Sequence, residues 1–310
     1  VYISHFLEEV KEVSDRFTVL RDGRVAASGD TSEVSTNDLA ALMVGRDVKE
    51  MYTRSERPDG SVILEISDLA GIADPKSASF ELATGEVLGI AGLVGAGRTA
   101  LLRVIFGLAK AQKGHLRVGA FIGPSSPNAR WSQSVGMVSE DRKQEGLALN
   151  LTVADNLTLT RLEGLGPFGL VLPSDQLEKS QSWIEKLGIK CEGPDQQVAG
   201  LSGGKQQKLA LARLLYHDVD LLLLDEPTRG IDVGSKAEIY RLIDALAMGD
   251  AEARLGPKAV LMVSSYLPEL LGVCDRIAVM CRGILQPARP VEELSEHEIM
   301  IAATGAGKVQ

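Results

Sequence analysis

Residues 87–99 read VLGIAGLVGAGRT and join an apolar run directly to a glycine-rich turn. The turn fits the pattern GxxxxGK[ST] at every fixed position except the lysine, which is Arg98 here. Gly95 and Gly97 permit the positive φ angles that let backbone amides converge on a phosphate. A helix beginning near Arg98 would add its N-terminal dipole, and Thr99 would place a hydroxyl on Mg²⁺. The segment predicts a phosphate-binding strand, loop and helix; for this motif alone, a glycine-rich turn without a ligand is the alternative.

A second motif is the acidic end of another apolar run, DLLLLDEPT at residues 220–228. A carboxylate at the end of a buried strand beside a phosphate loop is where Mg²⁺ needs a ligand, and Asp225 takes that place. Glu226 follows it and would orient or polarise an attacking water. Taken alone, the two carboxylates are also compatible with a solvated turn.

A third motif, LSGGKQQ at residues 201–207, precedes a helical stretch. The Ser202 hydroxyl and the amides of Gly203 and Gly204 would form a second anion-binding helix start. An ordinary Ser N-cap followed by glycines is the alternative for this motif alone.

The composition is globular and acidic. The chain has 310 residues, 45% hydrophobic and 24% charged, which fits one large domain or two ordinary ones. Lys+Arg 33 against Asp+Glu 42 gives a net charge of −9, so we expect no nucleic-acid partner. Three scattered cysteines argue for a reducing compartment and against a disulfide framework or a zinc site. No run is long enough to span a membrane, no signal peptide is visible, and the first residue is not Met. We therefore expect a soluble intracellular chain that is a fragment of a longer one.

The two ends of the chain resemble each other at a constant offset of 260 residues, over residues 1–25 and 260–284. The identical pairs are Ser4/Ser264, Leu7/Leu267, Glu9/Glu269, Asp15/Asp275, Arg16/Arg276 and Gly23/Gly283. The similarity could also arise by chance between two generic strand–helix–strand units. The alignment without gaps favours a duplication instead. On this interpretation residues 1–50 are the end of a first module, 51–61 a charged linker, and 62–304 a complete second module.

Strand-like and helix-like segments alternate after the linker. We expect strands at residues 62–66, 86–91, 135–138, 219–224 and 259–264, helices at 99–108 and 205–216, and a mostly helical region at 151–187. Continuous apolar runs such as 219–224 are typical of buried parallel strands. The alternation predicts an α/β fold with helices packed on a sheet.

The order of the three motifs, within about 135 residues, resembles that of ATP-binding cassette (ABC) ATPases. More narrowly, GLVGAGRT, SEDRKQEGL, LSGGKQQK and DEPTRGIDVGSK are similar to the second cassette of bacterial sugar-import ATPases of the ribose/galactoside/xylose type, in which two cassettes are fused. The resemblance covers essentially all 310 residues. It implies a P-loop NTPase fold of the ABC type, with a mainly parallel core sheet and a helical subdomain at about residues 140–215.

The resemblance also implies roles for single residues. Glu140 lies in the segment that senses γ-phosphate, Ser265 stands where a switch histidine normally follows a strand, and His5 would be that histidine in the first cassette. Arg142 and Lys143 would face the membrane partner or form a solvated charged turn. The implied catalytic residues are Glu226 and Glu140, and the implied metal ligands are Thr99, Asp225 and Glu140. The implied nucleotide-binding residues are Gly92, Leu93, Val94, Gly95, Ala96, Gly97, Arg98, Thr99, Ala100, Leu201, Ser202, Gly203, Gly204, Lys205 and Ser265.

Four departures from the family pattern predict a weak or altered site. Arg98 replaces the lysine, Glu140 stands where many cassettes have glutamine, and Ser265 replaces the histidine. No Tyr, Phe or Trp occurs at residues 62–79, where cassettes commonly place an aromatic side chain against adenine. Losing a histidine near the γ-phosphate removes a polar contact from the transition state. Arginine keeps the charge of lysine but not its compact shape.

The resemblance implies the cofactors ATP and Mg²⁺, and a peripheral position on the cytoplasmic face of the inner membrane. The implied partners are permease subunits, a first cassette and, indirectly, a sugar-binding protein. Two alternatives stay open: a half that binds nucleotide without turnover and regulates the first cassette, and a soluble cassette ATPase of translation or DNA repair. The acidic net charge argues against the latter.

Overall fold

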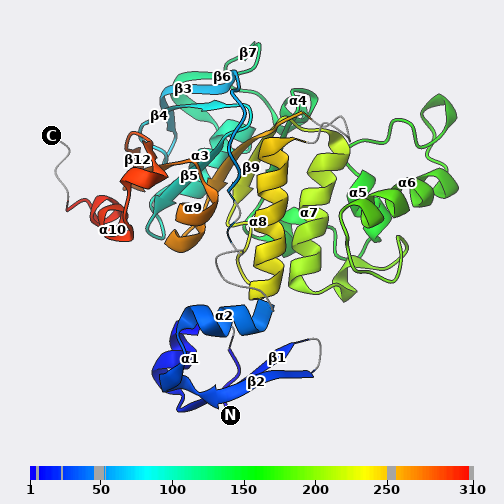
Figure 1. Cartoon of the computed structure of the whole chain (residues 1–310). Helices are drawn as coiled ribbons and strands as arrows, with labels where there is room; N and C mark the ends of the chain where they lie inside the picture. The colour runs from blue at the N-terminus through cyan, green and yellow to red at the C-terminus, as the bar shows by residue number, and fades with distance from the viewer. Residues whose placement is uncertain (5–6, 22–23, 45–51, 53, 250–255, 307–310) are drawn as a thin grey trace.

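The computed structural model describes residues 1–4, 7–21, 24–44, 52, 54–249 and 256–306. Its centre is a sheet of five parallel strands in the order β11 (Arg276–Cys281), β5 (Val87–Gly92), β10 (Ala259–Val263), β9 (Leu221–Asp225) and β8 (Val135–Val138). Two short strands, β12 (Ile284–Leu285) and β13 (Arg289–Pro290), pair antiparallel with β11. The predicted α/β fold with a mainly parallel sheet is confirmed (Figure 1).

A second, antiparallel sheet lies on one side of the first. Its order is β4 (Ala78–Ala83), β3 (Val62–Gly71), β6 (Ala111–Val118) and β7 (Phe121–Ile122). Helix α3 (Arg98–Phe106) belongs to the same apolar cluster as β3, β4 and β6. The short helix α4 (Pro127–Ser132) leads from this sheet to β8.

Alternating side chains of the central strands divide between two cores. On β9, Leu221 and Leu223 pack with α3 and the antiparallel sheet, whereas Leu222 and Leu224 pack with the helices of the other face. All four leucines are 0% exposed. Both faces of the strand are therefore buried, which explains why its sequence is continuously apolar.

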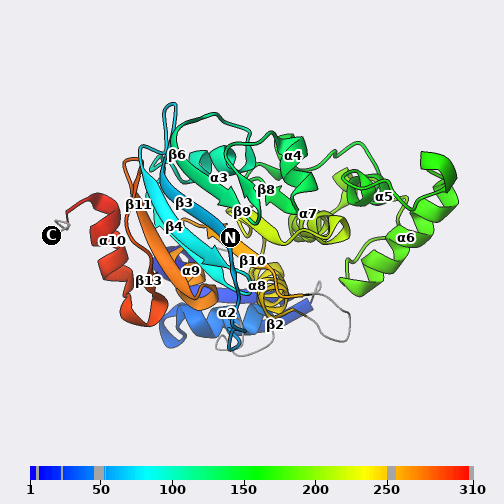
Figure 2. The same cartoon turned by 90° about the horizontal axis from the view of Figure 1, so that it is seen from above.

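The other face carries α7 (Gly203–His217), α8 (Val233–Met248) and α9 (Leu267–Val273). Helices α5 (Val153–Thr158) and α6 (Pro173–Lys186) lie beside α7 and extend to one side of the sheet, away from α10 (Glu296–Thr304) (Figure 2). The expected helical region at 151–187 thus contains two α-helices, separated by turns and a short 3-10 helix at residues 159–172.

Each element of the N-terminal unit recurs 260 residues later. Helix α1 (Leu7–Val13) matches α9, strand β1 (Arg16–Arg21) matches β11, and helix α2 (Thr36–Val44) matches α10, with β2 (Arg24–Asp30) completing the unit. Even a side-chain bond is repeated, since Ser4 Oγ donates to Glu9 Oε2 at 3.2 Å and Ser264 Oγ donates to Glu269 Oε2 at 2.5 Å. Helix α2 packs on α8 and buries Ala40 in the core there (Figure 1).

Residues of the segment predicted as a linker, 51–61, pack against and pair with residues of the larger part of the chain. Tyr52 stacks on Tyr240 with ring centroids 5.3 Å apart. The guanidinium of Arg57 pairs with Asp244 at 2.6 Å and with Asp275 at 3.0 Å, and its side chain is only 13% exposed. One of the charges that mark a linker in the sequence, Arg57, therefore holds the segment to the domain through a largely buried ion pair.

Candidate nucleotide-binding site

The phosphate loop connects β5 to α3. Gly95 and Gly97 have φ values of 78° and 103°, in the left-handed region that glycine adopts readily. A Cβ on Gly97 would also lie 3.2 Å from the Cβ of Asp74. Helix α3 begins after Gly97, and no side chain caps its first amides. Val94, at the tip, is 93% exposed. Within the loop the Ala96 amide donates to the Leu93 carbonyl at 3.0 Å, and the uncapped start of α3 is the part that an anion could approach.

Arg98 points into the protein. Its Nη1 donates to the Ser264 carbonyl at 2.5 Å, and its Nη2 lies 3.4 Å from Glu226 Oε1. The side chain is 8% exposed, and this burial lowers the pKa of Arg98. The guanidinium thus joins the residues that follow β9 and β10 through two nitrogens of one planar group.

Thr99 and Asp225 meet beside the loop. Thr99 Oγ1 donates to Asp225 Oδ1 at 3.3 Å, while Asp225 Oδ2 is buried and has no hydrogen-bond partner. Asp225 is 0% exposed, and burial raises its pKa to about 6. A buried carboxylate oxygen without a partner, next to a hydroxyl, fits a Mg²⁺ ion that takes one carboxylate and one hydroxyl from the protein. Among the described residues, no group of three or more His, Cys, Asp or Glu could hold a metal ion.

Glu226 lies between Arg98 and Ser265. The Ser265 hydroxyl donates to Glu226 Oε2 at 3.1 Å, so each carboxylate oxygen of Glu226 faces a donor. Glu226 has a φ of 47°, which is rare for a residue with a Cβ and is found preferentially at functional positions. The structure therefore places Ser265 against the carboxylate predicted to polarise water.

Glu140 lines the same cavity as Thr99, a hollow of about 520 Å³. Its carboxylate forms an ion pair with Arg229, the third residue after Glu226. Glu140 as a metal ligand or catalytic residue stays a prediction.

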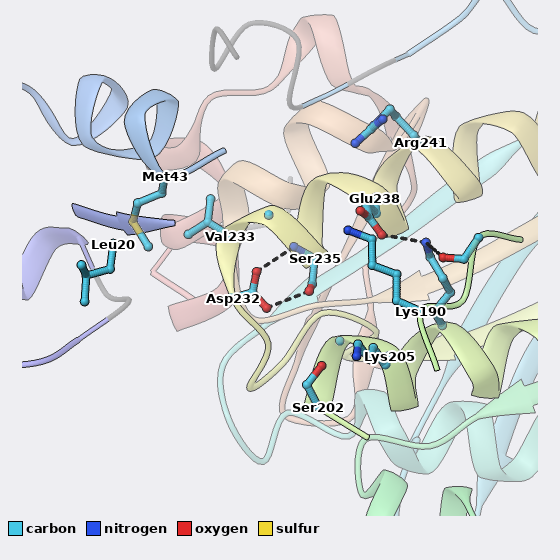
Figure 3. A pocket seen from close by; sticks show the side chains of 14 residues that line it. Leu20, Met43, Lys190, Ser202, Lys205, Asp232, Val233, Ser235, Glu238 and Arg241 are labelled. Carbon is cyan, nitrogen blue, oxygen red and sulfur yellow. Dashed lines mark hydrogen bonds and ion pairs between the residues drawn. The ribbon is translucent and has the colours of Figure 1, made fainter. Parts of the chain in front are cut away.

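The turn at residues 201–205, here called the signature turn, lines a different cavity, of about 570 Å³ (Figure 3). Ser202, Gly204 and Lys205 line it together with α8, and no residue of the phosphate loop is among its described lining. Leu20 and Met43 of the N-terminal unit line it as well (Figure 3). The structure brings together Arg98, Thr99, Asp225, Glu226 and Ser265. Ser202, Gly204 and Lys205 line a different cavity from the one that Thr99 lines.

Two residues near the site, Glu269 and Arg142, were missed or misjudged from the sequence, and a third prediction, His5, is not tested. Glu269 is 1% exposed and accepts from Ser264 Oγ and from Thr228 Oγ1 at 2.6 Å, and burial raises its pKa. The repeated Ser4/Glu9 pair was the signal that could have found it. Arg142, interpreted as facing outward or solvated, is half-buried and donates to the carbonyl of Arg229 at 2.9 Å. His5 lies outside the described residues.

The glycine-rich loop follows β5, and the Asp-Glu pair ends β9, which is separated from β5 by β10 in the same parallel sheet. Together with the SGG start of α7, these features define a P-loop nucleotide-binding domain of the ATP-binding cassette type. The sequence model described as ABC transporter matches residues 75–229. The chain belongs to the ABC transporter family.

Relatives cover nearly the whole chain. A protein of Rubrobacter xylanophilus named ribose import ATP-binding protein is 43% identical over 306 residues, 98% of this chain and 58% of its own length. A protein of Pseudomonas putida with the same kind of name is 40% identical over 311 residues, 100% of this chain and 59% of its own. The chain thus spans less than two thirds of the length of these relatives.

Solved structures show the same fold. A nucleotide-free ATP-binding cassette of an ABC transporter matches with a TM-score of 0.62 at 22% identity, over 77% of this chain and 94% of that one. A cassette in its ADP conformation matches with a TM-score of 0.60 at 22% identity, over 79% and 95%. Within the described ranges, no helix combines the length and the apolarity needed to cross a membrane.

Proposed function

We propose that this chain binds Mg-ATP at residues 92–100 and supplies its signature turn, residues 201–205, to a second nucleotide. The observation that carries the proposal is the buried, unpartnered Asp225 Oδ2 beside Thr99 and the phosphate loop. The amides of the loop and the start of α3 would hold the phosphates. Thr99 and Asp225 would hold Mg²⁺, which neutralises charge on the phosphates.

We further propose that Glu226 orients the attacking water, with Ser265 fixing one carboxylate oxygen at 3.1 Å. Arg98 faces the other oxygen at 3.4 Å. This engagement of both oxygens favours a second candidate function, in which this half binds nucleotide with little turnover and regulates a partner cassette. Glu226→Gln distinguishes them: a hydrolysing site loses turnover, whereas a regulatory site keeps the ATPase rate of the longer two-cassette chain unchanged.

The separation of the signature turn from the phosphate loop supports a head-to-tail pair of cassettes. In that arrangement residues 1–50 are the end of a first cassette, 51–61 the linker and 62–304 the second cassette. The recurrence of each N-terminal element after 260 residues supports this division.

The names of the relatives support a place in carbohydrate import. We propose that the chain is part of the ATP-binding subunit of a bacterial sugar importer, peripheral on the cytoplasmic face of the cell membrane. Its partners would be the permease subunits, the first cassette and, through the permease, a sugar-binding protein. Capture of a permease rather than of ribosomes or DNA would separate this role from that of a soluble cassette ATPase.

Calorimetric titration of the chain with ATP, with and without Mg²⁺, tests nucleotide binding. We expect binding that strengthens with Mg²⁺ in the wild type, and loss of the Mg²⁺ effect in Thr99→Ala, because one of its proposed ligands is gone. Absence of any heat of binding with folded wild-type protein would overturn the proposal.

A further inference from the structure

Glu269 is a buried carboxylate next to the turns that carry Glu226 and Ser265. It is the third residue of α9 and is 1% exposed. Thr228 Oγ1 donates to its Oε1 at 2.6 Å, and Ser264 Oγ donates to its Oε2 at 2.5 Å. Thr228 follows the end of β9, and Ser264 follows the end of β10. One carboxylate therefore joins the two turns.

The position of Ser264 decides where both donors that face Glu226 lie. The Ser264 carbonyl accepts from Arg98 Nη1 at 2.5 Å, and Arg98 Nη2 lies 3.4 Å from Glu226 Oε1. The next residue in the chain is Ser265, whose hydroxyl donates to Glu226 Oε2 at 3.1 Å. A shift of Ser264 would therefore move both donors relative to the Glu226 carboxylate.

The backbone of Glu226 is held at the same two strand ends. Its amide donates to the carbonyl of Val263, the last residue of β10, at 2.9 Å, and its carbonyl accepts from the Arg229 amide at 3.1 Å. Thr228 lies inside this turn, where its hydroxyl donates to Glu269. Both partners of the serine–glutamate hydrogen bond at the site are thus connected to the same buried carboxylate.

We propose that Glu269 is a positioning residue, which sets the distance between Ser265 and Glu226 by holding the residues beside them. The inference rests on the proposed function, because Glu226 orients the attacking water there. A displacement of about 1 Å at a reacting group can slow a reaction about 100-fold, so a residue that holds Glu226 in place affects the rate without touching the nucleotide.

A carboxylate suits this role better than a role in packing. Glutamate is seldom fully buried unless its charge is compensated, and burial raises the pKa of Glu269 because the charged form loses solvation. An apolar side chain would fill the same space without that loss. Only a group with two acceptor oxygens holds two hydroxyl donors at a fixed separation.

The same pair of residues recurs in the N-terminal unit. Ser4 Oγ donates to Glu9 Oε2 at 3.2 Å, and these residues are the counterparts of Ser264 and Glu269 at the offset of 260. The residue that follows the serine is a histidine in the first copy and a serine in the second. The pair is therefore kept where its neighbour changes, which fits a device that positions whichever side chain stands there.

Steady-state ATP hydrolysis by the longer two-cassette chain tests the role of Glu269. The part of kcat that is lost in Glu226→Gln measures this site. Glu269→Met removes both acceptor oxygens and should lose at least about nine tenths of that part, a tenfold effect, while KM for ATP stays within about threefold. Glu269→Gln accepts from one hydroxyl and donates to the other, so it should keep most of the rate. Glu178→Met, the same change at an exposed glutamate of α6, is the matched control.

The double variant Glu269→Met/Glu226→Gln separates positioning from a purely structural role. It should be no slower than Glu226→Gln alone, because both changes act on one step. Losses that multiply would overturn the inference, as would a rise in KM that accounts for the whole effect of Glu269→Met. Thr228→Val and Ser264→Ala each remove one donor, and they replace Glu269→Met in these measurements if that variant does not fold.

Calorimetry with Mg-ATP on the 310-residue chain keeps this inference apart from the proposed function. No heat of binding with folded wild-type protein overturns the proposed function and, with it, the role of Glu269. Binding together with an unchanged rate in Glu226→Gln leaves nucleotide binding in place and overturns the role of Glu269, since no water is then activated at this site. A wild-type rate in Glu269→Met overturns the inference alone.

Discussion

The buried carboxylate of Asp225 offers the sharpest test of the proposed metal site. Burial raises its pKa from the ordinary 3.8 to about 6, about 2 pKa units, which corresponds to about 3 kcal/mol. Because the pKa is higher in the folded chain, the folded state holds the proton more tightly than the unfolded state. Ionisation of the buried Asp225 carboxylate therefore lowers the free energy of unfolding. This loss is absent at pH values below 3.8, grows as the pH rises, and is complete above about pH 6.

Asp225→Asn removes the ionisable group, so the variant should gain stability relative to the wild type as the pH rises. Between about pH 4.5 and about pH 7.5 the difference in free energy of unfolding should grow by about 2 kcal/mol, measured by urea unfolding. Any effect of the asparagine amide on stability that does not depend on pH is the same at both pH values and therefore cancels. Asp59→Asn, the same change at an exposed aspartate, is the control substitution.

Saturating Mg-ATP should narrow the difference in stability between the two proteins. At a ligand concentration of about 100 times Kd, the wild type gains about 2.7 kcal/mol, whereas Asp225→Asn should gain little from Mg²⁺. A stability difference that stays flat across this pH range would refute the burial argument. If Mg²⁺ stabilised both proteins equally in the presence of ATP, the proposal that Asp225 binds Mg²⁺ would be refuted.

Three further substitutions test the neighbouring contacts. Arg98→Ala leaves Glu226 buried without its cation and should lower the free energy of unfolding by about 3 kcal/mol in urea titration. Adding Glu226→Gln should restore part of this loss, and a double variant no more stable than Arg98→Ala would contradict the ion pair. Thr228→Val removes a donor to Glu269 and should cost about 1–3 kcal/mol by thermal unfolding, and no loss would show the contact to be dispensable. Ser202→Ala should change stability by less than about 0.5 kcal/mol, because Ser202 makes no side-chain cap bond. It should also leave the calorimetric Mg-ATP affinity unchanged, since Ser202 lines the other cavity.

Much of the fold was predictable because its signals are local. The runs at 219–224 and 259–264 became β9 and β10, since a strand buried on both faces must be apolar throughout. The offset of 260 residues anticipated elements with matching bounds, because similar local sequences make the same turns and caps. The position of the phosphate loop followed from Gly95 and Gly97, whose backbone angles few other residues adopt.

The sequence by itself determined where the strands, the glycine turn and the acidic strand end lie along the chain, because these depend on neighbouring residues. Only the tertiary structure decided where side chains from distant segments point. Arg98 turns to Glu226 and Ser264, Arg142 turns to residues 229–230 and Gln206, and Asp225 keeps one oxygen without a partner. These directions arise from the packing of strand ends and helix starts far apart in sequence, and no local pattern encodes them.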